Sequence, residues 1–225
     1  MTRGVFVTGT DTGVGKTLVA SALVHALARQ GVRVAGMKPV VSGALESAGG
    51  MVWEDVESLR RGANVTATLD EVSPYRFVPA IAPHIAAREA GVEISLDVIA
   101  QRFAALAARA DAVVVEGVGG FLVPLGARET TADLAARLKL PLLLVVGMRL
   151  GCINHALLTR EAIAARGLDF AGWVANRVDA NMARYEENLD TLKKAMNAEM
   201  LGEIPFAPDS AAVLGMAAGL ARLFG

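Results

Sequence analysis

The sequence predicts an α/β fold: one domain, residues 1–225, in which a parallel sheet is covered by helices on both faces. Apolar runs of strand length alternate along the chain with segments whose apolar residues recur at helical spacing. Alternation of this kind produces right-handed crossovers and parallel strands. A polar or glycine-rich segment follows most of these runs, and parallel sheets bind ligands at that end of their strands. The expected site is therefore a cleft along one edge of the sheet.

Composition narrows the class of protein. A chain of 225 residues, 53% of them hydrophobic, has enough apolar surface for one large core. The formal net charge of -1 gives no electrostatic reason to expect nucleic acid or an anionic membrane as a partner. Cys152 is the single cysteine, which excludes an intrachain disulfide and suits a reducing compartment. The longest strongly apolar run, Leu140 to Val146, is too short to span a bilayer, and the N-terminus does not fit a signal peptide. We expect a cytoplasmic protein.

The N-terminal half is predicted to supply three strands and three helices. Glycine at position 31 stands where a helix C-cap glycine belongs, Pro39 closes the second apolar run, and prolines 74, 79 and 83 indicate irregular structure. The expected order is strand 5–7, helix from 16, strand 32–41 ending at Lys38-Pro39, glycine-rich loop 42–52, helix 54–62, irregular segment 66–82, helix 96–110 and strand 112–115.

The C-terminal half repeats the alternation. The run Ala112 to Val115 is apolar on both faces, as a central parallel strand should be, and the later runs are similar. The expected order is helix 131–138, strand 142–146, helix 153–166, strand 170–175, helix 183–197, a short strand before Pro205 and a last helix 211–224.

A phosphate-binding loop follows the first strand. The segment Gly9-Thr10-Asp11-Thr12-Gly13-Val14-Gly15-Lys16-Thr17 joins an apolar run to a helical pattern. In such a loop, backbone N–H groups and the helix N-terminus hold a triphosphate, the lysine reaches its terminal phosphates, and the hydroxyl ligates Mg²⁺. The loop is a variant, since the common motif has glycine where Thr10 stands. It predicts binding of a nucleoside triphosphate.

Two carboxylates are candidates for the magnesium site. Glu116 follows the strand 112–115, and oxygen ligands from it, from Thr17 and from phosphate suit this cation. The glycines at 117, 119 and 120 let backbone approach a phosphate or substrate closely. The alternative is that Glu116 only begins a surface turn. Asp55 starts a helix, where acidic residues are favoured anyway, so spacing alone leaves its role open.

Lys38, at the end of the second strand, is placed to stabilise anionic charge near the γ-phosphate. The alternative is a solvated lysine at the end of a strand. Ser42 and Gly43 either bind substrate or only form the turn. His84 is a candidate catalytic base, but a lone histidine more often has a structural role. No Ser-His-Asp arrangement or zinc spacing is present in the sequence.

Four segments together resemble dethiobiotin synthetases. The phosphate loop, Lys38-Pro39-Val40-Val41-Ser42-Gly43, the segment 115–120 and the segment 146–155 occur in the family's order, and segments 172–176 and 201–205 continue the match. The resemblance covers residues 4 to 207. The phosphate loop alone specifies only a P-loop superfamily, whereas Lys-Pro-Val-x-Ser-Gly and Leu-Gly-x-Ile-Asn-His are much more particular.

The resemblance implies an activity and a set of roles. The family closes a ureido ring from 7,8-diaminononanoate and CO₂ with ATP in biotin synthesis. It implies Lys16 and Lys38 as catalytic residues, and Thr17, Asp55 and Glu116 as Mg²⁺ ligands. Nucleotide contacts implied are Thr12, Gly13, Val14, Gly15, Lys16, Thr17, Asp55, Glu116, Gly117, Val118, Gly119, Asn176, Arg177, Pro205, Phe206 and Ala207.

Substrate contacts are expected at Thr12, Ser42 and the turn of Leu150, Gly151, Cys152, Ile153 and Asn154. That turn opens a helix, whose N-terminus suits the carboxylate of the diamine. The alternative is that the turn only caps the helix, with Asn154 near the N-cap. The resemblance implies a homodimer with the site near the subunit interface. Asn176-Arg177-Val178-Asp179 superficially resembles a guanine-reading element, yet the family favours ATP.

Two departures from the family pattern affect these expectations. Gly13 stands where some members carry Glu, and the chain after Pro208 fits poorly.

The main alternative is a partitioning-type P-loop ATPase that acts as a switch. Such proteins carry a signature lysine where this chain has Asp11, and no basic amphipathic segment ends the chain. A related amidoligase would need a further glutamine-hydrolysing domain, for which 225 residues leave no room.

Overall fold

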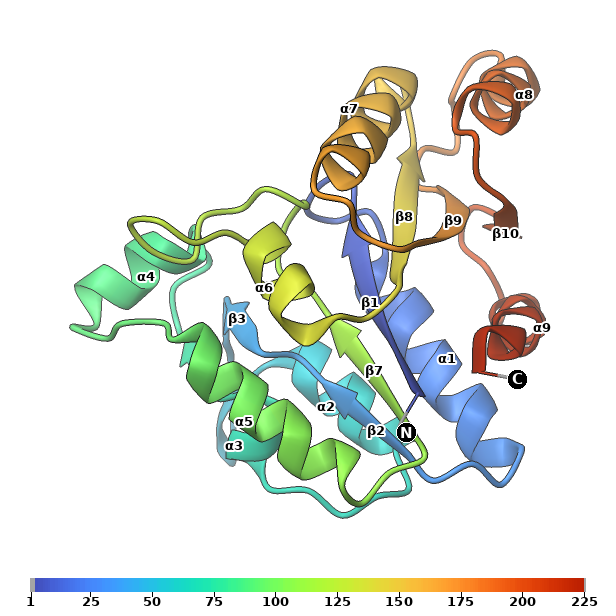
Figure 1. Ribbon diagram of the computed structural model, residues 1–225. Helices are drawn as coiled ribbons and strands as arrows, with labels where there is room; N and C mark the ends of the chain where they lie inside the picture. The colour runs from blue at the N-terminus through green and yellow to red at the C-terminus, as the bar shows by residue number, and fades with distance from the viewer. Residues whose placement is uncertain (1–2, 225) are drawn as a thin grey trace.

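A computed structural model of the chain describes residues 3–224 (Figure 1). Its centre is a six-stranded sheet whose paired neighbours all run parallel, in the order β10-β9-β8-β1-β7-β2. Its strands are β2 (Val34–Met37), β7 (Ala112–Glu116), β1 (Arg3–Gly9), β8 (Leu142–Met148), β9 (Phe170–Arg177) and β10 (Met200–Ile204). The fold class expected from the alternating pattern is confirmed.

Helices cover both faces of this sheet, as Figure 1 shows. The helices are α1 (Lys16–Arg29), α2 (Glu54–Gly62), α3 (Leu69–Val72), α4 (Pro83–Glu89), α5 (Leu96–Ala107), α6 (Thr131–Leu138), α7 (Cys152–Ala165), α8 (Tyr185–Ala195), α9 (Ser210–Leu220) and the 3₁₀ turn η1 (Ala221–Phe224). Among the described residues, no helix is long and apolar enough to cross a membrane.

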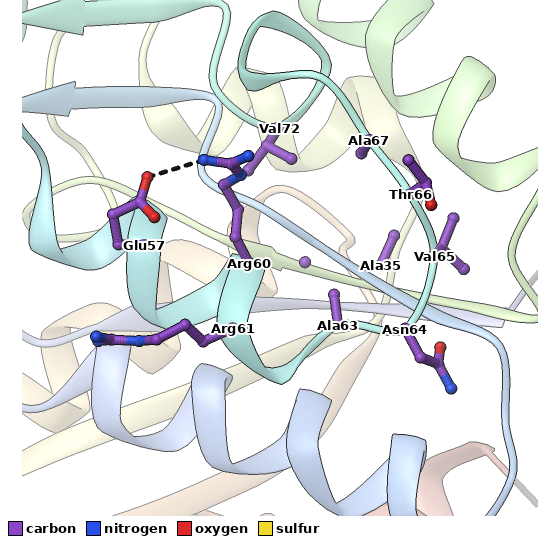
Figure 2. Close-up of a pocket in the computed structure, with 11 residues that line it drawn as sticks. Ala35, Glu57, Arg60, Arg61, Ala63, Asn64, Val65, Thr66, Ala67 and Val72 are labelled. Carbon is purple, nitrogen blue, oxygen red and sulfur yellow. Dashed lines mark hydrogen bonds and ion pairs between the residues drawn. The ribbon is translucent and has the colours of Figure 1, made fainter.

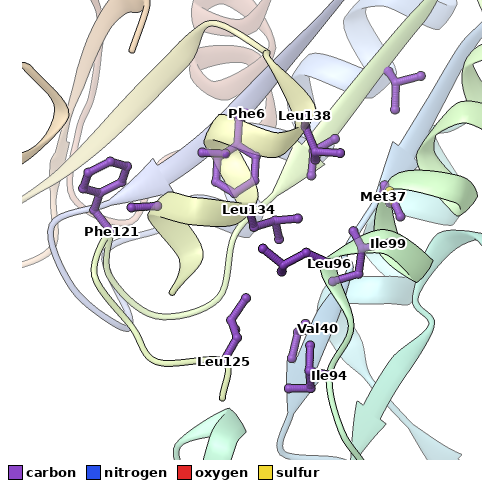
Figure 3. Close-up of a cluster of buried hydrophobic side chains, with 14 of the residues drawn as sticks. Phe6, Met37, Val40, Ile94, Leu96, Ile99, Phe121, Leu125, Leu134 and Leu138 are labelled. Atoms are coloured by element: carbon purple, nitrogen blue, oxygen red, sulfur yellow. The ribbon is translucent and has the colours of Figure 1, made fainter. Parts of the chain in front are cut away.

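The alternation of side chains along β1 builds two separate cores. Phe6 points to one face, where it joins Ile99 of α5 and Leu134 of α6 in a buried cluster (Figure 3). Val5 and Val7 point to the other face and pack with α1 and α9. Because successive strand residues face opposite sides, a central strand must be apolar throughout. Burial of both faces therefore holds the carboxyl ends of the strands at fixed positions.

The predicted strand 32–41 is wrong in one respect: it is two strands. Strand β2 ends at Met37 and β3 (Val40–Ser42) pairs with β6 (Tyr75–Phe77) in a separate two-stranded sheet. Pro39 has no N–H to continue a ladder and restricts the residue before it. The break leaves Lys38 between the two sheets.

The segments predicted to be irregular contain regular structure. The glycine-rich loop 42–52 forms an antiparallel hairpin, β4 (Leu45–Ser47) with β5 (Gly50–Val52). The segment 66–82 holds α3 and β6, and α4 follows, its first residue being Pro83. Thr68 closes a capping box with Glu71 at the start of α3, a signal of helix initiation that the prolines obscured. Most other elements lie within a few residues of their predicted bounds.

Candidate active site

A cleft of about 680 Å³ lies at the carboxyl ends of β1, β2 and β7. It brings together residues from distant parts of the sequence, namely Thr12, Gly13, Gly15, Lys16, Thr17, Lys38, Val41, Ser42, Asp55, Ala80, Ile81, Ala82, Pro83, Glu116, Val118, Gly119 and Val123. They include the two candidate catalytic lysines and the three candidate metal ligands. They also include Thr12 and Ser42, the two candidate substrate contacts that lie outside the turn 150–154. The cleft is thus the place where the sequence-predicted groups meet.

The loop between β1 and α1 is shaped by glycine. Gly13 and Gly15 have φ angles of 74° and 94°, in the left-handed region that favours glycine. Helix α1 begins at Lys16, and no side chain caps its N-terminus. The Nδ2 of Asn176 donates a hydrogen bond of 2.8 Å to the Val14 carbonyl, which ties the loop to the end of β9. The uncapped N–H groups suit an anionic ligand such as phosphate.

Lys16 is buried at the floor of the loop. Its Nζ donates a hydrogen bond of 2.9 Å to the Asp11 carbonyl, so the side chain is held within the turn that it would share with a phosphate. Burial, together with the charge of Lys38, lowers the pKa of Lys16 to about 8. A triphosphate beside this ammonium would favour its charged form.

The hydroxyl and the two carboxylates predicted to hold Mg²⁺ converge on one point. The Oγ1 of Thr17 lies 2.9 Å from Asp55 Oδ1 and 2.8 Å from Glu116 Oε1. Glu116 is fully buried, and its Oε2 has no hydrogen-bond partner among the described residues. An orphaned buried carboxylate oxygen in an all-oxygen donor set fits a hard divalent cation. No group of three or more His, Cys, Asp or Glu side chains suited to a metal occurs within residues 3–224, so phosphate or water oxygens would complete the shell.

Lys38 is the cation that faces this pair of carboxylates. Its Nζ lies 2.5 Å from Glu116 Oε1 and 2.8 Å from Asp55 Oδ2, and it also donates to the Gly117 carbonyl. Burial alone would lower the pKa of Lys38, but the two carboxylates outweigh it and raise the pKa above the usual range. Burial conversely raises the pKa of Glu116. Lys38 is therefore a fixed buried ammonium, not the solvated terminal lysine that spacing alone allowed.

The substrate contacts expected from the resemblance fall into two groups. Thr12 and Ser42 line the cleft, and Ser42 Oγ is buried without a hydrogen-bond partner in the described part of the chain. The turn 150–154 does not line the cleft; Leu150 is 92% exposed, and Gly151, with a φ of 95°, precedes α7. No side chain caps that helix; the Cys152 N–H donates to the Arg149 carbonyl at 2.9 Å, and the N–H groups of Ile153 and Asn154 are left for an anion.

The nucleotide contacts expected at Arg177 and in the turn 205–207 are not among the residues that line the cleft. Arg177 stacks over the ring of Tyr185, with its guanidinium carbon 4.8 Å from the ring centroid. Phe206 is 49% exposed in the turn after β10, and Ala207 has a left-handed φ of 46°. Asp179 accepts a hydrogen bond from the N–H of Asn181, a local turn contact.

Sequence reasoning missed two contributions. Residues 80–82 were expected only to be irregular, yet together with Pro83 they line the cleft. Arg149 had no assigned role, and its guanidinium forms an ion pair with Asp11 of the phosphate loop. Neither residue type nor spacing signals these positions, because both contacts arise only when distant strands are adjacent. His84 is absent from the cleft lining; it lines a different cavity with Arg88 and Arg128.

The sheet order and the loop define a P-loop nucleotide-binding protein of the α/β class. A family model described as an AAA domain matches residues 3–213. Among solved structures, the septum site-determining protein MinD of Pyrococcus horikoshii, complexed with Mg-ADP, has a TM-score of 0.61 at 16% identity, over 100% of this chain and 94% of that one. A ParA family ATPase of Chlorobium tepidum has a TM-score of 0.59 at 15% identity, over 100% and 97%. At these identities the likeness concerns the fold alone.

The relatives that are similar in sequence are more specific. The ATP-dependent dethiobiotin synthetase BioD of Aromatoleum aromaticum is 55% identical over 203 residues, which cover 90% of each chain. That of Nitrosospira multiformis is 52% identical over 206 residues, covering 92% of this chain and 89% of the relative. The chain belongs to the family of ATP-dependent dethiobiotin synthetases. The switch ATPases that were the main alternative share its fold but not this level of identity.

Proposed function

We propose that this protein is the ATP-dependent ligase that closes the ureido ring of dethiobiotin in biotin biosynthesis. Its substrates are 7,8-diaminononanoate, CO₂ or bicarbonate as its source, and ATP, and it releases ADP and phosphate. Membership of the family supports this activity. The observation that carries it is the burial of Lys38 against Glu116 and Asp55 directly beside the phosphate loop. One buried cation thereby lines the same cleft as Lys16 and Thr17 of the phosphate loop.

The reaction proceeds in three steps whose atoms balance. One amine of the substrate adds to CO₂ and loses a proton, which gives a carbamate. A carbamate oxygen attacks the γ-phosphorus, forming a carbamic-phosphoric anhydride and releasing ADP. The second amine then attacks the carbamate carbon, phosphate leaves with the bonding electrons, and the amine loses its proton as the ring closes.

The buried groups are assigned to these steps by charge. Lys38 holds the carbamate and balances its negative charge, while Lys16 stabilises charge on the transferring phosphoryl group. Thr17, Asp55 and Glu116 would hold Mg²⁺, which when bound neutralises phosphate charge. Thr12 and Ser42, which both line the cleft, orient the substrate.

The two ends of the diamine need separate anchors. Its amines lie in the cleft, and its carboxylate binds at the N-terminus of α7, near the turn 150–154, contributed in part by the second subunit of a homodimer. This rests on the uncapped helix start and on the exposure of Leu150, which a partner would cover. We further propose that ATP is the preferred nucleotide and that Asn176 and the turn 205–207 contact its base. We also propose that the chain forms a single domain and that the protein is cytoplasmic.

The test is a turnover assay with diaminononanoate, bicarbonate, Mg²⁺ and ATP, in which dethiobiotin and ADP are measured together. Equal amounts of both products are expected, and omission of any one component should abolish ring formation. ATP hydrolysis that is indifferent to the diamine and bicarbonate would instead indicate a switch protein. Replacement of ATP by GTP or CTP at equal concentration tests the base preference, and a clear preference for GTP would contradict it.

A further inference from the structure

A second cavity, of about 430 Å³, lies at the outer edge of the sheet (Figure 2). It is bounded by the edge strand β2, by helix α2 and by the segment that runs from Ala63 to Val72. None of its lining residues belongs to the cleft described above. The cavity is therefore a separate site.

The pairing of β2 shows which backbone groups face this cavity. Strand β2 pairs with β7 on one side, and the Ala112 N–H donates to the Arg33 carbonyl at 3.1 Å. In a parallel ladder, alternate residues of a strand bond to the same neighbour. Ala35 and Met37 therefore bond toward β7, whereas Val34, Gly36 and Lys38 present their N–H and C=O groups to the outer edge.

Two of those three outward residues have partners across the edge. Val34 is paired with Asn64. The side-chain Oδ1 of Asn64 accepts from the Val34 N–H at 2.8 Å, and the backbone N–H of Asn64 donates to the Val34 carbonyl at 3.3 Å. The N–H of Lys38 donates to the Val72 carbonyl at 2.9 Å. The intervening segment bulges away from the strand between these two contacts.

Gly36 is left in the gap. It is buried and lines the cavity, and its outward N–H and C=O have no hydrogen-bond partner among residues 3–224. Buried backbone groups that lack a hydrogen-bond partner within the protein are rare. A donor and an acceptor side by side call for a ligand with the complementary pair, the edge of an amide or a ureido group.

The rim of the cavity adds a charge preference. Arg60, Arg61 and Glu57 line it, which leaves one net positive charge. Figure 2 shows Arg60 reaching toward Val72, with its guanidinium paired to Glu57, while Arg61 extends away along α2. Arg60 is about two-fifths exposed, so its guanidinium can exchange this partner for a ligand carboxylate.

We propose that this cavity binds a small carboxylic acid that carries an amide or ureido group, with the amide edge on Gly36 and the carboxylate on Arg60. Dethiobiotin, the product under the proposed function, has both groups and is the ligand to which we commit; this identity rests on that function. The location gives binding a consequence, because β2 leads directly into Lys38 and α2 carries Asp55.

The test is amide-resolved NMR of the full chain, titrated with dethiobiotin, its methyl ester, N-acetylglycine and hexanoate. Dethiobiotin should shift the Gly36 amide resonance saturably and slow its hydrogen exchange. The ester, which lacks the charge, and hexanoate, which lacks the amide edge, should bind at least tenfold more weakly. Binding of the product in the cleft would be seen separately, at Ser42 and Gly43.

Arg60→Gln should weaken dethiobiotin binding at Gly36 about tenfold or more, while Arg102→Gln, an exposed arginine outside the cavity lining, should not. A Gly36 resonance that no probe moves, or that hexanoate moves equally, overturns the inference. A shift with N-acetylglycine but not with dethiobiotin overturns the commitment to the product. An enzyme that makes dethiobiotin but shows no response at Gly36 refutes this site alone, whereas a response without ring closure refutes the proposed function alone.

Discussion

Arg149 Nη2 lies 2.5 Å from Asp11 Oδ2, so an ion pair joins the segment after β8 to the phosphate loop. Asp11 uses its other carboxylate oxygen to accept the Thr12 N–H at 2.7 Å, and its backbone carbonyl accepts from Lys16. Asp11 thus holds both the loop backbone and the side chain of Lys16, the lysine that we propose to contact the phosphates. In the partitioning-type switch ATPases, a signature lysine is expected at this position.

Loss of this ion pair should loosen the loop without unfolding the protein. Both side chains are more than two-fifths exposed, and pairs of that kind contribute about 0.2–1 kcal/mol. Arg149→Met should therefore weaken nucleotide binding about twofold to fivefold and leave the melting temperature nearly unchanged. Titration calorimetry with an ATP analogue measures this. Arg149→Lys should recover most of the affinity, and Arg137→Met, which breaks an exposed pair with Asp97, is the control.

Replacing each of the two candidate catalytic lysines should distinguish a role in catalysis from a role in nucleotide binding. Lys38→Ala should reduce ring closure about a hundredfold to a thousandfold, the usual cost of removing one preorganised charge, with nucleotide affinity nearly intact. Lys16→Ala should weaken both. The measurements are steady-state turnover and nucleotide calorimetry on each variant. Near-normal turnover of Lys38→Ala would contradict its assignment, and unchanged nucleotide affinity of Lys16→Ala would contradict its phosphate role.

Removal of Lys38 also leaves Glu116 buried without its cation. Breaking a buried pair from one side costs about 3–5 kcal/mol, so the melting temperature of Lys38→Ala should fall. The nucleotide calorimetry of the same sample shows whether the variant is folded. The double variant Lys38→Met with Glu116→Gln should regain part of that stability, although it stays inactive, because the fully buried charge of Glu116 is gone and the Asp55 carboxylate that remains is 38% exposed.

Two glycines of the phosphate loop provide a matched comparison. A Cβ on Gly15 would lie 2.2 Å from Asn176 Nδ2, whereas one on Gly13 meets nothing within 4 Å. Gly15→Ala should cost about 2–3 kcal/mol of unfolding free energy and most of the nucleotide affinity, because it combines backbone strain with displacement of the Asn176 amide. Gly13→Ala should cost about 1 kcal/mol. Urea denaturation and calorimetry on both variants test this; equal effects would disprove the packing argument.

The thiol of Cys152 should react slowly in the folded protein. It is 1% exposed, and burial raises its pKa, so less thiolate is present than for a free cysteine at the same pH. At pH 8 we expect alkylation by iodoacetamide at least tenfold slower than in urea. Mass spectrometry of timed samples measures both rates. Equal rates would show that the start of α7 opens readily.

The proposed homodimer can be tested at Leu150, the most exposed large apolar side chain within residues 3–224. Leu150 is 92% exposed beside the proposed carboxylate anchor. Leu150→Asp should shift sedimentation velocity profiles toward monomer and raise the KM for the diamine, whereas Val92→Asp, 42% exposed elsewhere, should do neither. A fully active monomer in the unmodified protein would remove the basis for an interface site.

Much of this protein could be predicted from local sequence. The order of strands and helices follows from apolar periodicity, and the phosphate loop from residues contiguous in the chain. The sequence placed Lys38 and Glu116 at the ends of two strands and Asp55 at the start of a helix, so they were expected near the same edge of the sheet. The distances between their side chains could not be predicted from the order of elements along the chain.

The tertiary structure decided which polar groups come into contact, because these contacts join segments that are far apart in the sequence. Pro39 signalled an end to a strand, but pairing of β3 with β6, which moves Lys38 between two sheets, depends on residues more than thirty positions later. The ion pair of Arg149 with Asp11 exists because β8 lies beside β1. The unpaired edge at Gly36 likewise depends on where the segment after α2 leaves and rejoins the strand. Local periodicity specifies which face of an element is apolar; only packing specifies which polar groups meet.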